Sequence, residues 1–291
     1  MKNLLLLLLV SLAYISCSGD DADNGQNSDS TDYFPITETS FWEYNYQNSN
    51  QGNSNSGQFP AMMEGSVVFD GKIYQVLDNT TYLTGSSNMI FVQKSLNKEI
   101  TLRPIVEFLG LSLDFEDVAF IKNVMQPGQL LKSTTLQITS ESAAIPEGHN
   151  LSGTITPVIS ITLHSRHIDK NSEMRINGQL YENICHNQLS YDIEIEYLID
   201  ATYNSGNQQI PIQLNHQLLG NQTFGNLEIW LAKEKGIIKT DYSYSFQNLE
   251  MNTTIQTAGL SLDLMEIQPN LLDFNQSLNN IGNASLISYT P

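Results

Sequence analysis

The sequence predicts a mainly β protein whose strands form an antiparallel sheet. Apolar and acidic residues alternate strictly over residues 191–197, which is the pattern of a strand with one buried and one wet face. The dipeptides at 70–71 (Asp-Gly) and 177–178 (Asn-Gly) are strong signals for two-residue hairpin turns. A parallel sheet would need long amphipathic helices between its strands. The hydrophobic pattern of the sequence predicts only a few short helices, so it favours an antiparallel sheet.

The composition is typical of an extracellular β protein. Hydrophobic residues make up 40% of the chain and charged residues only 15%, while Asn, Gln, Ser and Thr are abundant. The formal net charge is −18, which excludes nucleic acid as a partner because that binding requires a basic face.

The first residues have the order of a secretory signal peptide, which we assign to 1–16. Lys2 supplies a positive start, residues 4–13 form an apolar run, and Ser16 precedes Cys17. The run is shorter than the roughly 20 residues that a membrane-spanning helix needs. An ordinary signal peptide would leave a free secreted protein.

The stretch Cys17-Ser18-Gly19-Asp20-Asp21 resembles the lipobox cysteine and acidic export signal of Bacteroidetes surface lipoproteins. This resemblance implies that Cys17 is acylated and that Ser18, Gly19, Asp20 and Asp21 direct export. It also implies a lipid-anchored protein on the outer face of the outer membrane. Stable attachment takes at least two acyl chains, which a diacylated cysteine provides. Residues 17–32 have no apolar periodicity, so a flexible acidic tether is expected.

Residues 33–291 form the expected β domain. It opens with Tyr33-Phe34-Pro35 and continues with Trp42 and Tyr44, where aromatic and polar residues alternate. These residues, together with a late segment at 230–239, resemble Bacteroidetes lipoproteins of unknown function, which begin with Tyr-Phe-Pro and Trp-x-Tyr and end on an Ala-Lys…Gly-Ile-Ile-Lys hairpin. The resemblance implies a curved sheet, half-barrel or lipocalin-like, and no established activity.

Further elements follow from alternation and turn residues along the chain. The Asn, Ser and Gly residues of 47–58 predict a loop, Pro104 is expected to end a strand, and 116–124 is either a short helix or a connection. The expected strands lie at 67–69, 73–77, 89–94, 99–103, 111–115, 130–139, 159–163, 174–176, 180–181, 191–197, 242–246 and 260–264, with a short helix at 271–280.

Similar segments recur in the same order in both halves of the chain. They predict two tandem β units, at about 33–140 and 150–291, although biased composition produces such echoes by chance. The pairs are 71–75 with 178–182, 89–94 with 228–233, and 110–115 with 259–264.

No catalytic motif, nucleotide-binding loop or metal-ligand spacing is present in the sequence. We therefore expect no enzyme activity, cofactor or metal site. His164 and His167 would point to opposite faces of a strand, and the histidines are expected on exposed strands and turns. A single cysteine in an apolar strand, such as Cys185, is expected to be a small buried hydrophobic residue.

Two aromatic stripes allow two interpretations. They are either the core, which alternating strand faces require, or a concave site for a lipid or sugar. The residues are Trp42, Tyr44, Tyr46, Tyr242, Tyr244 and Phe246.

The sequence thus predicts a non-enzymatic, lipid-anchored binding protein at the cell surface, with a glycan, lipid or protein as ligand. A periplasm-facing carrier of apolar ligands is the alternative, followed by an enzyme that acts on extracellular polymers.

Overall fold

The computed structural model describes residues 33–291 apart from 36, 38, 51, 86–89, 95–98, 109–110, 123, 146–149, 247–248, 258–259 and 265–278. Most of the described residues lie in strands, and one short helix, α2, lies among them. The elements are β1 (Phe41–Asn50), β2 (Asn53–Phe69), β3 (Lys72–Leu77), α2 (Thr80–Thr84), β4 (Ile90–Lys94), β5 (Ile100–Phe108), β6 (Leu111–Asp114), β7 (Val118–Ile121), β8 (Leu130–Thr139), β9 (Ala143–Ala144), β10 (Leu151–Ile176), β11 (Gln179–Ser205), β12 (Gln208–Ala232), β13 (Gly236–Ser245), β14 (Thr254–Thr257), β15 (Leu260–Asp263) and β16 (Asn279–Thr290).

One large, curved antiparallel sheet contains fourteen of the described strands. Their order is β6-β5-β4-β3-β2-β1-β16-β13-β12-β11-β10-β8, with β7 paired to β5 and β9 paired to β10. The sheet is not closed. Its two ends nevertheless approach each other, because β7 lies against β8 and β10. The mainly β, curved antiparallel fold that the sequence predicts is therefore confirmed.

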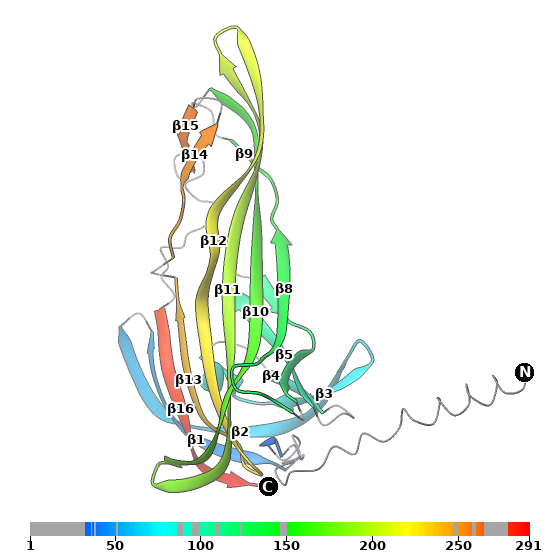
Figure 1. Ribbon diagram of the computed structural model, residues 1–291, viewed down its shortest axis with the longest axis vertical. Helices are drawn as coiled ribbons and strands as arrows, with labels where there is room; N and C mark the ends of the chain where they lie inside the picture. Colours follow the sequence, from blue (N-terminus) through cyan, green and yellow to red (C-terminus); the bar gives the residue numbers. More distant parts are fainter. Residues whose placement is uncertain are drawn as a thin grey trace, which may run out of the picture.

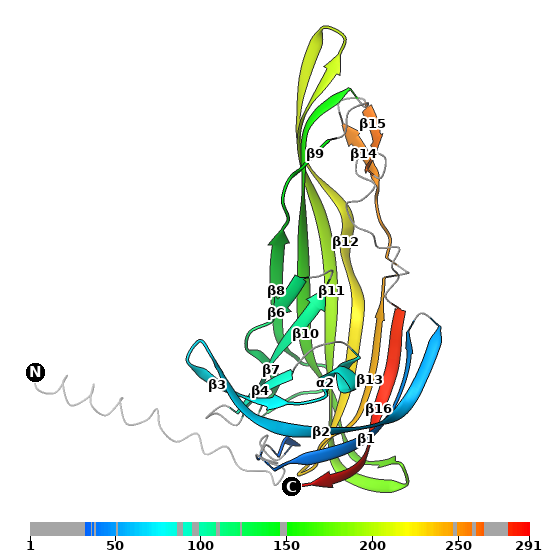
Figure 2. The ribbon, with the colours of Figure 1, turned by 180° about the vertical axis from the view of Figure 1, so that it is seen from behind.

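Three long strands run the whole height of the molecule and form a tall blade, whose upper part extends beyond the other strands of the sheet (Figure 1). β10, β11 and β12 contain 26, 27 and 25 residues. At about 3.3 Å per residue, the longest of them spans roughly 85 Å. The shorter strands β1 to β5 wrap around the lower part, as the view from behind shows (Figure 2), and the separate hairpin β14-β15 lies beside the upper part of the blade.

The strand β16 joins the two halves of the sheet. It pairs with β1 on one side and with β13 on the other, both antiparallel. The residues 33–140 contribute the strands from β6 to β1 in one unbroken meander, and β8 pairs instead with β10 of the second half. Tandem duplication of the two units stays a prediction.

The concave side of the sheet is filled by a large apolar core. Its fully buried side chains include Trp42, Tyr44, Phe115 and Tyr197. The strand β7 adds to the closure of this interior, because the Asn187 side chain on β11 donates a 2.7 Å hydrogen bond to the carbonyl of Phe120 on β7. The sheet thus encloses side chains of its own strands.

Several predicted turns are confirmed by the backbone. Asp70 and Gly71 have φ of 50° and 78°, and Asn177 and Gly178 have φ of 51° and 83°. Two successive residues with positive φ are the requirement of the turn that matches the twist of a hairpin. The strand over 191–197 lies within β11 with its apolar residues buried.

Three local predictions are wrong. Residues 47–50 and 53–58 form the paired ends of β1 and β2 rather than a loop, because the neighbouring strand imposes the extended conformation on a segment with weak preference of its own. Pro104 lies inside β5, at the point where the strand exchanges its partner β4 for β6, so its missing N–H is tolerated. Residues 116–124 contain the strand β7.

Some predictions fall outside the described residues. These are the signal peptide at 1–16, the acylated Cys17, the export signal Ser18 to Asp21, the tether up to residue 32, and most of the short helix expected at 271–280.

Candidate functional site

The outer face of β2, β1 and β16 carries a shallow groove lined by uncharged polar side chains. We call it the amide groove and define it by Asn45, Gln47, Ser56, Gln58, Asn177, Asn283 and Ser285. Its volume is about 480 Å³, and an adjoining hollow of about 400 Å³ extends it along the same strands to Ser49 and Ile281.

The register of the three strands brings these side chains together. Asn45 lies opposite Gln58 on β2 and opposite Ser285 on β16. Gln47 in turn lies opposite Ser56 and Asn283. Even-numbered residues of β1, such as Trp42 and Tyr44, point into the core, so the odd-numbered amides must point outward.

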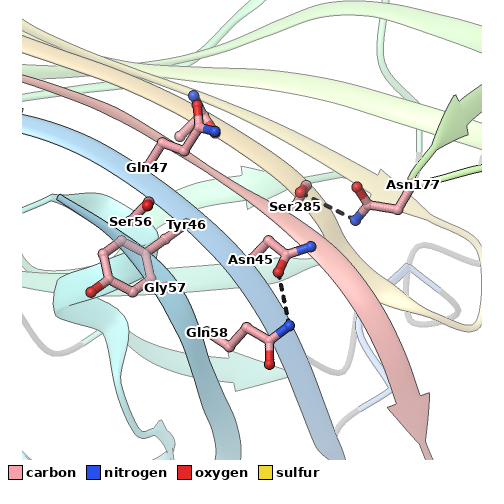
Figure 3. A pocket seen from close by; sticks show the side chains of 9 residues that line it. Asn45, Tyr46, Gln47, Ser56, Gly57, Gln58, Asn177 and Ser285 are labelled. Atoms are coloured by element: carbon pink, nitrogen blue, oxygen red, sulfur yellow. Dashed lines mark hydrogen bonds between the residues drawn. The ribbon is translucent and has the colours of Figure 1, made fainter. Parts of the chain in front are cut away.

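The turn between β10 and β11 forms one wall of the amide groove (Figure 3). Asn177 Nδ2 donates to the carbonyl oxygen of Leu286 at 2.9 Å and to Ser285 Oγ at 3.3 Å. On the other side, Gln58 Nε2 donates to Asn45 Oδ1 at 3.1 Å. These bonds lie on the two opposite sides of the groove at its Asn45 end, so both sides are held in place there.

Other groove side chains are available to a ligand. Within the described chain, no hydrogen bond is present for the side chains of Gln47, Ser56 or Asn283. An exposed, unsatisfied amide offers both donors and acceptors. Between Ser56 and Gln58, Gly57 faces the inner side, where the ring of Tyr46 lies 3.0 Å from the place where a Cβ would be. The missing side chain therefore makes room for this ring and not for a ligand.

Charged side chains lie beside the amide groove on β1 and on β13. Glu43, two residues before Asn45 on the same face of β1, accepts a hydrogen bond from Ser288 Oγ at 3.4 Å. Lys239 and Asp241 on β13 lie opposite Ser285 and Asn283, and the Lys239 ammonium group forms a salt bridge with the Asp241 carboxylate. The Lys239 ammonium nitrogen also lies 4.2 Å from the ring centre of Trp230. The residues that line the groove itself carry no charge, in a chain of formal charge −18.

Trp230 continues the same outer row of side chains across β12. His186 stacks on its indole ring at 4.3 Å between ring centres and bonds Glu228 through Nε2 at 2.6 Å. Because His186 on β11 and Lys239 on β13 flank the indole from neighbouring strands, its faces are occupied by protein. Trp230 therefore stiffens the outer face and offers no open ring surface.

The six aromatic residues singled out in the sequence all lie on the inner side of their strands or in the segment that follows. Trp42 Nε1 donates to the carbonyl of Lys235 at 2.7 Å, and the Tyr44 hydroxyl donates to that of Ile237 at 2.8 Å. These bonds satisfy the polar atoms of two buried rings. Tyr242 is also buried, and Tyr46, Tyr244 and Phe246 are half-buried against the core.

A buried polar cluster interrupts the apolar interior between β10 and β11. His167, Asn187 and Cys185 are each 0% exposed, which confirms the expected burial of Cys185. The expectation of exposed histidines is wrong for His167, because the alternation of β10 turns this side chain inward, and for His216, whose Nε2 lies 2.7 Å from the carbonyl oxygen of Asn252. His167 Nδ1 lies 2.8 Å from Asn187 Oδ1, and Cys185 Sγ lies 3.5 Å from the same oxygen.

The protonation states of this cluster do not suit nucleophilic catalysis. Burial raises the pKa of the Cys185 thiol to about 12, and burial also lowers the pKa of His167. Asn187 Oδ1 can only accept, so Nδ1 of His167 carries the proton and Nε2, which has no partner among the described residues, does not. A neutral thiol beside a neutral imidazole lacks the thiolate that such chemistry needs.

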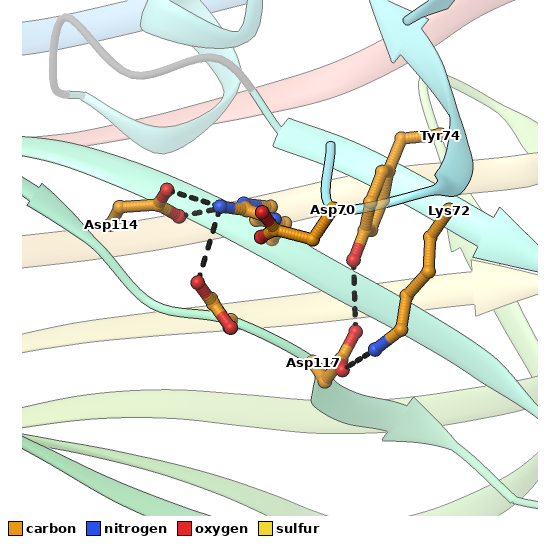
Figure 4. Close-up of polar contacts among 7 residues, drawn as sticks. Asp70, Lys72, Tyr74, Asp114 and Asp117 are labelled. Atoms are coloured by element: carbon orange, nitrogen blue, oxygen red, sulfur yellow. Dashed lines mark hydrogen bonds and ion pairs between the residues drawn. The ribbon is translucent and has the colours of Figure 1, made fainter. Parts of the chain in front are cut away.

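A second polar cluster lies on the opposite face of β3 and β5 from the main core (Figure 4). Arg103 is buried, binds Asp114 through two hydrogen bonds of 2.8 and 2.5 Å, and lies 4.5 Å from the ring centre of Phe69. Asp117 accepts from both Tyr74 and Lys72. The guanidinium also contacts Asp70 and Glu116, so its donors are used within the protein. This cluster holds the β2-β3 hairpin against the loop after β6.

Among the described residues, no group of three or more His, Cys, Asp or Glu side chains is placed to hold a metal ion. Nor does any helix of that part of the chain reach the length and apolarity that crossing a bilayer demands.

Sequence reasoning missed the amide groove. Asn45 lies on the polar face of the predicted strand around Trp42 and Tyr44. The other residues lie in the predicted loop at 47–58, in the turn at 177–178, and in a strand that no alternation predicted. The excess of Asn, Gln and Ser was visible, but composition cannot tell which of these residues share one face.

Comparison with known proteins adds no relative: no protein-family model matches the chain, and no curated protein or solved structure matches it significantly.

Proposed function

We propose that this protein is a non-enzymatic binding module, lipid-anchored at the outer membrane and exposed on the cell surface, and that it binds its partner through the outer face of the sheet. The N-terminal pattern that ends in Cys17 supports the anchor, and the acidic Asp20 and Asp21 support export to the surface. The tether at 17–32 would hold the β head away from the membrane.

The amide groove carries the binding part of the proposal. It is a hollow of about 480 Å³, within the range that ligand sites commonly occupy, and its free side chains are donors and acceptors without charge. Its walls come from β1, β2, β16 and the β10-β11 turn, so rigid strands hold the side chains in place.

The alternative carrier function would need an open apolar cavity inside the sheet. The described core is filled by large side chains such as Trp42 and Tyr197. An apolar gap beneath the β14-β15 hairpin, lined by Ile155, Ile199 and Ile255, has a volume of only about 10 Å³, far below the roughly 300–1,000 Å³ of common ligand sites. These observations favour the outer face over the interior as the binding surface.

The anchor and exposure can be tested together in a Bacteroidetes host. Mass spectrometry of the mature N-terminus should find acyl chains on Cys17, and proteinase K added to intact cells should remove the β head while a periplasmic marker survives. The C17S variant is the matched control and should leave the membrane fraction. An unmodified Cys17 on a chain recovered from the culture fluid would refute the anchor, and a protected head would refute surface exposure.

A further inference from the structure

We infer that the amide groove binds a neutral, hydroxyl-rich glycan chain. This inference rests on the proposed function and names its ligand class. Asn45, Gln47, Gln58 and Asn283 supply amides, while Ser56 and Ser285 supply hydroxyls. Each of these groups donates and accepts, as does each sugar hydroxyl, so either partner can satisfy the other in more than one orientation.

The electrostatics of the groove select against charged ligands. None of the residues that line it is ionisable apart from the phenol of Tyr46, and the nearby Lys239 and Asp241 neutralise each other. An anionic polymer would find no guanidinium or ammonium group to replace its counterions and would be repelled by the acidic chain. A cationic ligand would find no carboxylate among the lining residues, because Glu43 lies beyond Asn45 and accepts a hydrogen bond from Ser288 Oγ.

The position of the groove selects against a peptide. Extended peptides commonly bind by adding a strand to a free sheet edge, where backbone groups are unpaired. Here β1 is paired on both sides over the length of the groove, so its backbone groups are already used. The lining also lacks the apolar pockets that would anchor peptide side chains, since its exposed apolar member is Ile281 at the far end.

The shape of the groove indicates a chain rather than a single sugar. The two hollows share Gln47, Ser56 and Asn283 and run along β1 from Asn45 to Ser49. At about 3.3 Å per residue this path is roughly 13 Å long. A groove of this length accommodates a short oligosaccharide segment. A longer polymer could extend beyond the groove at the end formed by Ser49 and Ile281.

The inference can be tested by calorimetric titration of the full chain in detergent. The probes are neutral oligosaccharides derived from glucan, mannan, xylan and galactan, with polygalacturonate as the charged probe. We expect one neutral probe to bind. The variants Q47A and N283A remove side chains without a partner, so each should weaken binding about three- to tenfold. S56W should abolish binding because an indole would fill the groove.

Matched controls separate a local loss from a folding defect. Q209A removes an exposed amide at the upper end of β12 and should bind like the wild type, and all variants should keep the wild-type melting temperature. Binding that survives S56W would place the ligand elsewhere and overturn the inference, as would tighter, salt-dependent binding of polygalacturonate. Failure of every neutral probe would refute the glycan class, while the acylation and protease results would still decide the anchor.

Discussion

The buried polar cluster makes a quantitative prediction about stability. The substitution N187L keeps the side chain close in size but removes the acceptor of His167 Nδ1–H and the donor to the Phe120 carbonyl. An orphaned buried polar group costs about 1–3 kcal/mol, so two of them should lower the free energy of unfolding by about 2–6 kcal/mol. This loss is a large fraction of the roughly 5–15 kcal/mol that stabilises a typical domain.

A double-mutant cycle distinguishes hydrogen bonding from simple packing. H167L alone leaves Asn187 Oδ1 with only the weak Cys185 donor, and we expect a loss of about 1–3 kcal/mol. In H167L/N187L the mutual bond is absent on both sides, so the total loss should be smaller than the sum of the single losses by about 1–3 kcal/mol.

Urea unfolding followed by tryptophan fluorescence measures these differences. S165A is the matched control, because Ser165 Oγ is buried with no partner among the described residues and its removal should cost little. Strictly additive losses for H167L and N187L would refute the reasoning, since they would mean that the two side chains contribute independently.

Three further predictions concern pH, the Arg103 cluster and a buried tyrosine. Burial lowers the pKa of His167 below its value in the unfolded chain. The contribution of the neutral His167 to stability is therefore fully present above about pH 6.5 and is lost on acidification. The melting temperature of the wild type should fall more steeply from pH 7.5 to 5 than that of H167Q. Superimposable pH curves would contradict this. R103K loses the paired hydrogen bonds to Asp114 and the contact with Phe69, and urea unfolding should show a loss of about 1–3 kcal/mol; unchanged stability would mean that the cluster is not structural. Y44F leaves the buried Ile237 carbonyl without its donor and should lower the melting temperature, by the equivalent of about 1–3 kcal/mol, whereas the half-buried Y46F should change it little.

Much of the fold follows from local signals. Alternation over 191–197 fixes which side of β11 is buried, and the Asp-Gly and Asn-Gly turns need positive φ that few other dipeptides allow. Such features depend on neighbours in the chain, so they can be read without knowledge of the tertiary structure.

The candidate site could not be predicted because it depends on distant pairing. Residues 47–58 have weak strand preference, and their conformation is imposed when β1 pairs with β2 and β16. The segment that forms β16 is rich in Asn, Gly and Ser, and its apolar and polar residues do not alternate clearly. The sequence therefore contains no sign that Ser285 and Asn283 are neighbours of Asn45. The wall residue Asn177 belongs to a third segment altogether.

The position of β16 has a consequence for the order in which the molecule assembles. Glu43 and Ser288 face each other across the β1-β16 junction although 245 residues separate them along the chain. Contacts between residues so far apart in the sequence form only after a long segment of chain has lost conformational entropy. We therefore expect this junction to form late and slowly during folding. Until residues 279–290 are in place, β1 and β13 each present an unpaired edge, and such edges can pair with another chain and aggregate.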